Sequence, residues 1–431
     1  MLSVSSAHFV TRPLTQQKQE MLRYLIDQFA KSVNFCIRKC LEHGITSRAK
    51  LHRIAYTEWK SRFDLATHWF HSAGRVAVQI LRSWRRLCRQ GQADPSKPPV
   101  YKAKTMRLEL WDNGNASGVC YFRGHAVQIR VRKGEHLWLP LVVSEHHRLR
   151  YLEDWRDGKL KVGEITISLF KGRANVYVPF KREVEPRRVE GVCGVDINER
   201  SVDITILKPG QEPKHISLDV SKLPAIRHAS QLKRKSIQRK LDVLPQRPVQ
   251  KQRLWAKYRR RERNRTGQIL HLVSKQIAGI AKHERVAVAF ECIKGIRDSM
   301  RSKRKSKDGR VLRKDMRRRL NQWPFRKLQF YISYKVERLG LPTVEVSSYR
   351  KSKLCPICGE YNGPNGHTYR CQACGFEASR HLVASWNIAK DGASRVPADC
   401  WQMQQVAEEP VAPTKPPVEP ERIPCRTGVT V

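Results

Sequence analysis

The chain has 431 residues, of which 40% are hydrophobic, enough to fill the cores of about two to four domains and to exclude a fully disordered protein. Its formal net charge is +45, from 84 lysines and arginines against 39 aspartates and glutamates. Such an excess would repel itself in the folded state unless a polyanion neutralised it, so the composition favours a nucleic-acid partner over a membrane, for which the sequence offers no amphipathic anchor or long apolar run.

The N-terminal segment, MLSVSSAHFVTRPL, lacks the charged stretch and apolar run of a secretory signal. Eight of the twelve cysteines are scattered singly, as is typical of thiols in a reducing compartment. We therefore expect a protein of the cytoplasm or nucleoid.

Residues 3–12 alternate weakly and predict a first strand, which Pro13 ends. Apolar residues then recur every three or four positions from Gln19 to Leu41 and from Arg75 to Leu87, as on one face of a helix. Four arginines occupy the other faces of the second helix, where they contact phosphate or only solvent: Arg82, Arg85, Arg86 and Arg89.

The motif ADPSKPP at residues 93–99 ends this helical region. Short strands separated by turns follow it, which is the pattern of a small antiparallel β-barrel. Because residues 3–12 can add a strand to the barrel, residues 14–95 are expected to form a helical domain inserted into it. The barrel itself then takes residues 1–13 and 96–186.

Two carboxylates follow apolar strands in the second half of the chain. The strand in GVCGVDIN ends near Asp196, and the strand VAVAF at residues 286–290 is followed by Glu291. Ligands bind at the carboxyl ends of strands in open α/β sheets, and Mg²⁺ prefers carboxylate oxygens, so the pair predicts a two-metal site for phosphodiester hydrolysis. These residues by themselves leave open that both carboxylates only pair with arginines.

A long basic helical region, from about residue 221 to 282, separates the two strands. It contains three further candidates for phosphate contacts, Arg259, Arg260 and Arg261. After Lys390 the composition turns to proline, glutamate, valine and alanine, which predicts a disordered tail over residues 396–431.

Residues 351–378 hold two CxxC pairs, Cys355 with Cys358 and Cys371 with Cys374. Each pair places two thiolates on one tight turn, and two such turns facing each other supply the four ligands of a tetrahedral Zn²⁺. The alternatives are disulfides and chance clustering. Since a bound zinc replaces a hydrophobic core in so small a segment, we expect the metal to be structural.

The order of these motifs, namely GVDIN, VAVAFECIKGI, SYRKSKLCPICG, the second CxxC and a last helix ending in WNIAK, resembles the transposon-encoded TnpB proteins and the compact type V CRISPR effectors of prokaryotes. The resemblance covers nearly the whole chain. It implies a multidomain α+β fold, with an N-terminal antiparallel β-barrel (wedge) and its inserted helical recognition domain. An RNase H-like (RuvC) α/β domain at 187–350 and 379–395 follows, interrupted by a zinc ribbon at 351–378 that binds target nucleic acid.

The resemblance also implies that Asp196 and Glu291 are the first two catalytic carboxylates of a RuvC site that uses Mg²⁺. The third is an Asp in a segment of the form DRDxNAAxNI, where this chain reads SRHLVASWNI. His381 therefore stands at the position of the missing Asp, and Ser379 and Val383 replace two other residues of the motif. Because a neutral imidazole is a poor substitute for a carboxylate on Mg²⁺, the replacement should weaken the metal site.

Three functions are open on this basis. The first is an RNA-guided DNA-binding protein, which pairs a bound guide RNA with double-stranded target DNA beside a short flanking motif and cleaves weakly or not at all. The second is an active endonuclease, in which His381 itself or a nearby carboxylate, Glu377 or Asp391, serves as the third ligand. The third is a zinc-ribbon RNA-binding accessory factor of transposition. Either one copy of the chain or a homodimer assembles on one RNA.

Overall fold

The computed structural model describes residues 2–111, 118–242, 248–293, 323–363, 366–401 and 421–423. The chain divides into two units, Leu2–Glu183 and Val184–Val431, and each of them combines helices with a sheet. Among the described residues, no helix combines the length and the apolar character needed to span a bilayer.

The first unit contains an eight-stranded sheet with the order β2-β7-β8-β1-β5-β4-β3, in which β6 also pairs with β8. All its pairings are antiparallel. The strands are β1 (Leu2–Thr11), β2 (Met106–Leu108), β3 (Cys120–Phe122), β4 (Ala126–Arg132), β5 (Glu135–Val142), β6 (Lys161–Val162), β7 (Ile165–Phe170) and β8 (Arg173–Glu183).

This sheet curls until its two edges meet. The backbone beyond β2 bridges to β3 through Leu110 and Cys120, and the Trp111 N–H donates to the Cys120 carbonyl over 2.7 Å. A Cβ at Gly118 would lie 2.0 Å from the Trp111 nitrogen, so glycine is required where the edges approach. The prediction that the N-terminal strand joins this sheet is confirmed, since β1 pairs with β8 and β5.

The first unit has three long helices, α1 (Gln16–Glu42), α2 (Arg48–Arg62) and α3 (His68–Arg89), of which α1 and α3 contact the sheet and α2 packs on both of them. Short helices α4 (Glu145–His147) and α5 (Glu153–Arg156) flank a π-helical turn at Arg148–Leu152. The two helices predicted from periodicity correspond to α1 and α3. The pattern missed α2 because this helix buries only Leu51, Ala55 and Trp59.

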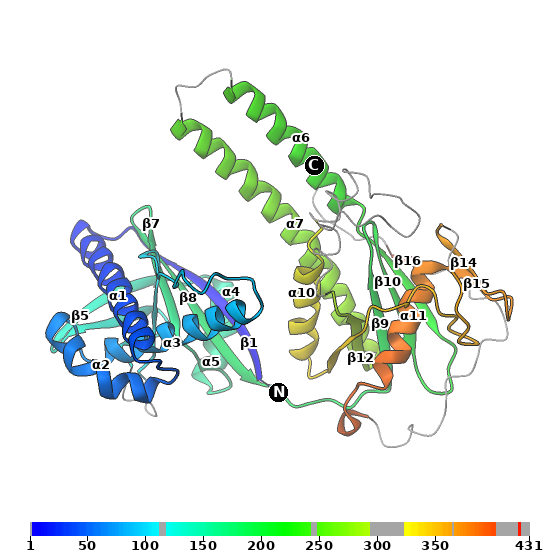
Figure 1. Ribbon diagram of the computed structural model, residues 1–431, viewed down its shortest axis with the longest axis horizontal. Coiled ribbons are helices and arrows are strands. Elements are labelled where there is room, and N and C mark those ends of the chain that lie inside the picture. Colours follow the sequence, from blue (N-terminus) through cyan, green and yellow to red (C-terminus); the bar gives the residue numbers. More distant parts are fainter. Residues whose placement is uncertain are drawn as a thin grey trace. The chain divides into compact units, whose positions relative to one another are not determined.

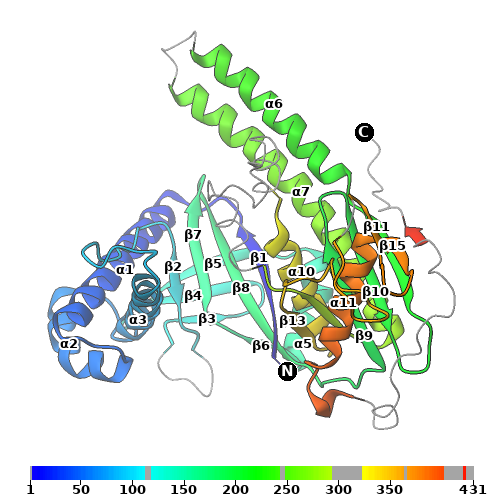
Figure 2. The same cartoon turned by 45° about the vertical axis from the view of Figure 1, so that its right-hand side comes forward.

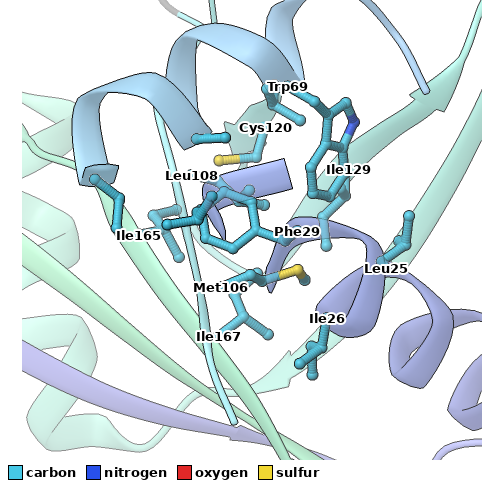
Figure 3. Packing of buried hydrophobic residues seen from close by; sticks show 14 of the residues in the cluster. Leu25, Ile26, Phe29, Trp69, Met106, Leu108, Cys120, Ile129, Ile165 and Ile167 are labelled. Carbon is cyan, nitrogen blue, oxygen red and sulfur yellow. The ribbon is translucent and has the colours of Figure 1, made fainter. Parts of the chain in front are cut away.

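Side chains from the helices and from the strands form one core in this unit. Phe29 of α1 and Trp69 of α3 meet Leu108 of β2 and Ile129 of β4, as Figure 3 shows. The Trp69 indole N–H donates to the Arg130 carbonyl over 2.7 Å, so the ring is buried without leaving its polar atom unpaired.

The second unit is built on a six-stranded sheet with the order β13-β12-β9-β10-β11-β16. Strands β9, β10 and β11 are antiparallel neighbours, whereas β12 runs parallel to both β9 and β13. The strands are β9 (Gly191–Ile197), β10 (Ser201–Leu207), β11 (Lys214–Asp219), β12 (Val286–Glu291), β13 (Thr343–Val346) and β16 (Glu421–Ile423).

Helices lie on both faces of this sheet, with α11 (Arg380–Ala393) on one face and α7 (Pro248–Glu284) and α10 (Phe325–Glu337) on the other (Figures 1 and 2). Residues 286–290 of β12 are all buried, so the prediction of a central strand covered from both sides is confirmed. Helix α6 (Lys222–Asp242) lies beside α7 in a long hairpin that extends from the sheet (Figure 1). Strands β14 (Thr368–Arg370) and β15 (Glu377–Ser379) form a separate small sheet.

The prediction of a disordered tail over residues 396–431 is wrong for the described part of that segment. Val396 is buried in the core of the second unit. Cys400 ends the 3-10 turn Ala398–Cys400, and its carbonyl accepts from the Val189 N–H over 2.8 Å. Glu421–Ile423 forms β16 beside β11. The compositional bias hid these apolar anchors, and residues 402–420 and 424–431 lie outside the described part.

Helix α11 packs unusually close to the sheet because two glycines lie in the interface. A Cβ at Gly194 of β9 would lie 2.1 Å from the Ser385 carbonyl oxygen, and one at Gly392 would lie 2.5 Å from the Ala289 Cβ. The buried hydroxyls of Thr205 and Ser385 hydrogen bond over 2.6 Å across the same interface. The start of α11 is therefore held against the carboxyl end of β9.

We expect Gly194→Ala to lower the free energy of unfolding by about 3 kcal/mol, because the new methyl group overlaps the α11 backbone. Urea unfolding followed by circular dichroism measures the change. Gly267→Ala in α7 is the matched control: its Cβ meets no atom within 4 Å, so helix propensity should raise stability by about 0.5–1 kcal/mol. Equal stability of the two variants would contradict the close packing.

Candidate functional site

Four side chains meet where the carboxyl ends of β9 and β12 reach the start of α11. The register of the two parallel strands pairs Val195 with Phe290, so Asp196 and Glu291 follow side by side. The Nδ1 atom of His381, in the first turn of α11, lies 3.4 Å from Asp196 Oδ2. The three residues predicted for a catalytic site therefore lie together at one edge of the sheet.

The fourth side chain, Asp203, was not predicted. The β9–β10 hairpin pairs Asp203 with Asp196, and the ligand atoms of Asp196, Asp203 and His381 all lie within 4.8 Å of one another. The Asn198 amide nitrogen bridges the two carboxylates, donating to Asp196 Oδ2 over 2.7 Å and to Asp203 Oδ2 over 3.0 Å. Two oxygen donors and one nitrogen donor are thus available for a cation.

Asp203 is itself held by its neighbours in the sheet. The Ser201 hydroxyl donates to Asp203 Oδ2 over 2.6 Å, and the Ser217 hydroxyl of β11 donates to Oδ1 over 2.7 Å. A carboxylate with these partners is a fixed acceptor for the Asn198 amide. Asp203 therefore orients Asn198, and through it the Asp196 carboxylate.

Glu291 has an electrostatic environment of its own. Burial and, to a smaller extent, the nearby Asp196 together raise the pKa of Glu291 to about 7, although Lys351 opposes this shift. Burial also lowers the pKa of Lys351, whose ammonium group forms an ion pair with Asp391. The site therefore combines a carboxyl group that holds its proton up to neutral pH with a buried amine beside it.

Asp196 and Glu291 lie in a pocket of about 760 Å³, which we call the acidic pocket. Its rim is basic and aromatic, with residues from the loop after β13 and from the cysteine segment. The lining consists of Asp196, Asn198, Glu291, Ser347, Ser348, Tyr349, Arg350, Lys351, Ser352, Lys353, Tyr361, Arg380, His381 and Ala384.

The four cysteines of the CxxC pairs form a second cluster. Their sulfurs lie 3.6 Å apart between Cys355 and Cys374 and 3.5 Å apart between Cys358 and Cys371, which is too far for disulfide bonds. Thiolates about 2.3 Å from a tetrahedral zinc lie about 3.8 Å from one another, so this donor set fits Zn²⁺. Each pair is followed by a glycine with positive φ, 77° at Gly359 and 74° at Gly375, as the predicted turns require.

Helix α11 connects the cysteine cluster to the acidic pocket. Val383, two residues after His381, packs with Tyr369, Cys355 and Cys371. The Asn387 amide donates to the carbonyls of Lys351 and Leu354, over 2.8 Å in each case. One helix thus anchors both the cysteines and the loop that lines the pocket.

The two carboxylates that were considered as replacements for the missing Asp do not line the pocket. Asp391 pairs with Lys351, and Glu377 Oε2 lies 3.9 Å from Arg370 Nε in the small sheet. Ser379 is the N-cap of α11, where its hydroxyl accepts from the His381 N–H over 3.3 Å. Serine is a good substitute for aspartate as a cap, which explains how the helix start survives the change of motif.

The arginines singled out as phosphate contacts occupy two regions. In the first unit, Arg82 and Arg85 donate to the carbonyls of Thr46 and Ile45, each over 3.3 Å, so part of their donor capacity is used within the fold. Arg86 and Arg89 are exposed in the last turns of α3. In the second unit, Arg259, Arg260 and Arg261 are exposed on α7.

Two family models match the chain. The Cas12f1-like TNB domain matches residues 325–388, which include the four cysteines and most of α11, and the uncharacterized protein MJ0013 family matches residues 25–111. A TnpB-like protein of Methanocaldococcus jannaschii is 34% identical over 271 residues, which are 62% of this chain and 91% of the relative. The CRISPR-associated endodeoxyribonuclease Cas12f1 of Sulfoacidibacillus thermotolerans is 32% identical over 83 residues, 19% of this chain and 20% of that protein.

Among solved structures, a Cas12f1 complex with sgRNA and target DNA has a similar fold. The match has a TM-score of 0.60 and 13% sequence identity, and it covers 87% of this chain and 83% of that chain. At this identity the likeness concerns the fold alone.

Glu291 should make stability depend on pH. The folded protein holds the Glu291 proton up to about pH 7, whereas the ordinary pKa of a glutamate side chain is 4.5. The free energy of unfolding should therefore fall as pH rises from 4.5 to 7, by on the order of 2–3 kcal/mol, and stay low above that range. Urea unfolding of Glu291→Gln in magnesium-free buffer should lack this decrease. Glu377→Gln removes the same charge at an exposed position, so this variant should retain the decrease. A wild type whose free energy of unfolding does not change between pH 4.5 and 7 would contradict the prediction.

Proposed function

Because the chain belongs to the TnpB-like family, we propose that it is an RNA-guided DNA-binding protein whose DNA cleavage with Mg²⁺ is weak or lost. A bound guide RNA would pair with target DNA beside a short flanking motif, and the protein would block transcription at the site it occupies. The observation that carries the weak-cleavage part is the imidazole of His381, 3.4 Å from Asp196, at the place of the third carboxylate.

The architecture supports an assignment of separate domains to the parts of this function. The sheet of the second unit has three antiparallel strands followed by two parallel ones, and helices cover both of its faces. This arrangement supports an RNase H-like RuvC domain at 187–350 and 379–395. The curled sheet supports a wedge barrel at 1–13 and 96–186, and α1 to α3 support a helical recognition domain at 14–95. The cysteine cluster supports a zinc ribbon at 351–378.

The donor set explains why cleavage should be weak. Mg²⁺, when bound, would polarise a phosphodiester and activate a water molecule, and it requires hard oxygen ligands in an octahedron. Asp196 and Glu291 fit this requirement, whereas the His381 imidazole does not. Glu291 must also lose its proton to serve as a ligand, and burial opposes that loss.

The charge distribution supports nucleic acid as the partner. The chain has 45 more positive than negative side chains, so carboxylates within the chain cannot neutralise them all. Five of the candidate phosphate contacts are exposed, namely Arg86, Arg89, Arg259, Arg260 and Arg261. Contacts of this type read the sugar–phosphate backbone, which leaves sequence recognition to base pairing with the guide. The related Cas12f1 structure contains both an sgRNA and target DNA.

One observation favours active cleavage as a second candidate. Asp203 places a third carboxylate within 4.8 Å of Asp196 and His381, although on β10 and not on α11. If Asp203 serves as a ligand, the site has three carboxylates in a changed arrangement. In that case Asp203→Ala should abolish cleavage that the wild type performs.

The decisive experiment compares variants of the purified chain. RNA that copurifies is sequenced, and DNA matched to that RNA is given to the wild type, Asp196→Ala and His381→Asp in Mg²⁺. We expect all three to bind the DNA, His381→Asp to cleave at least about tenfold faster than the wild type, and Asp196→Ala not to cleave. This order of cleavage rates should hold when the three variants are compared at equal amounts of bound RNA.

Two results would replace the proposal. Efficient cleavage by the wild type that disappears in Asp196→Ala would establish the active endonuclease. A chain without specific RNA, which binds DNA in a salt-sensitive and sequence-independent manner, would instead be an accessory factor of transposition.

The zinc site yields a separate prediction. We expect about one Zn²⁺ per chain by metal analysis. Cys371→Ser should lose the metal and several kcal/mol of stability, because Val383 and Tyr369 then lose the cluster against which they pack. Cys88→Ser, at a cysteine of α3 outside this cluster, should keep the zinc. Zinc retained at full occupancy by Cys371→Ser would contradict the assignment.

A further inference from the structure

An arginine lies between two tyrosine rings at the rim of the acidic pocket. The guanidinium carbon of Arg350 is 4.7 Å from the centroid of the Tyr349 ring and 4.6 Å from that of Tyr361. The Lys353 ammonium lies 5.8 Å from the Tyr361 centroid. All four residues line the acidic pocket.

Both rings are open to solvent. Tyr349 is 68% exposed and Tyr361 is 44% exposed, although each ring has the guanidinium beside it. Aromatic rings that serve only to hold a loop are usually buried, where they contribute most to stability. The exposed surfaces of these rings therefore remain available to a flat partner.

The backbone at Arg350 is held in an uncommon conformation. Its φ is 59°, which an arginine rarely adopts, and its carbonyl accepts from the N–H groups of Lys353 and Leu354 over 3.0 and 3.2 Å. This turn directs the guanidinium between the rings. Strain of this kind persists only where the surroundings enforce it, and it is commonest at binding and catalytic sites.

The lining of the acidic pocket carries both basic and acidic side chains. Arg350, Lys353 and Arg380 stand on the lining together with the two rings, whereas Asp196 and Glu291 form the acidic part. A phosphate chain is attracted by the basic rim, and its bases can stack on the exposed rings. Bases inside a duplex already stack on their neighbours, so this chemistry selects an unpaired strand.

We propose that Tyr349, Arg350 and Tyr361 form a stacking platform that takes an unpaired DNA strand and leads its backbone to the acidic pocket. Bases stack on the tyrosine rings, while Arg350 holds the rings in place and contacts phosphate. The platform positions the strand and has no part in chemistry. The proposal deepens the proposed function and rests on it for the origin of the strand as opened target DNA.

The test measures single-strand binding by the full chain with its copurified RNA. The probe is a thymidine oligonucleotide that carries one 2-aminopurine, read by anisotropy for affinity and by quenching for stacking. We expect Tyr349→Ala and Tyr361→Ala each to weaken binding about 5- to 100-fold and to reduce the quenching. Tyr349→Phe should retain both, because the ring and not the hydroxyl is required.

Two matched variants separate stacking from damage to the loop. Phe330→Ala removes a ring of α10 that is 64% exposed and is absent from the pocket lining, and it should leave binding unchanged. Arg350→Gly removes the guanidinium while accepting the positive φ, so it should weaken binding without backbone strain. Zinc content and thermal stability of each variant establish that the fold is retained.

The outcomes distinguish this proposal from the proposed function. Unchanged single-strand affinity in folded Tyr349→Ala and Tyr361→Ala would overturn the platform, even if a guide RNA copurifies and directs binding to target duplex. An equal loss in Phe330→Ala or Tyr349→Phe would also overturn it. A tyrosine-dependent single-strand affinity in a chain that carries no specific RNA would support the platform and refute the guided function.

Discussion

The close packing of α11 on β9 is the constraint on which the rest of the second unit depends. Gly194 and Gly392 remove the two side chains that would separate the helix from the sheet. As a result His381 reaches Asp196, Asn387 fixes the loop that lines the acidic pocket, and Val383 enters the cysteine cluster. The cysteine cluster and the candidate catalytic edge are therefore coupled through one helix, and the cysteines act on the pocket by positioning α11.

The acidic pocket shows how a motif can change while its framework persists. Ser379 caps α11, as an aspartate could, and Asn387 retains two hydrogen bonds to the loop before Cys355. The resembling motif has an aspartate at the position where this chain has His381. Around it, Asp203 and Asn198 hold Asp196 by hydrogen bonds that remain inside the protein. The edge of the sheet thus places an imidazole beside the Asp196 carboxylate, and an imidazole suits hard cations less well than a carboxylate does.

Much of this site could be predicted from the sequence, and the part that was missed has an identifiable reason. Apolar strands ending at Asp196 and Glu291 predicted their positions, because parallel strands bring their carboxyl ends to one edge. Asp203 was missed although a signal existed: a tight turn joins Asn198 to Ser201, and its register places Asp203 opposite Asp196. Tyr349, Arg350 and Tyr361 gave no such signal, since Tyr361 follows the first cysteine pair and meets the other two only through the fold.

The sequence by itself determined the basic charge of the chain, the two cysteine pairs, the main strands and two of the long helices, because charge, spacing and periodicity are local properties. The tertiary structure decided which side chains share the pocket and which do not. Asp391 and Glu377 are close to His381 in sequence, yet one pairs with Lys351 and the other with Arg370. The end of the chain behaves in the same way: composition predicted disorder from residue 396, whereas Val396 is buried in the core. Proximity in sequence does not specify proximity in space, and burial depends on what the rest of the fold provides to cover a side chain.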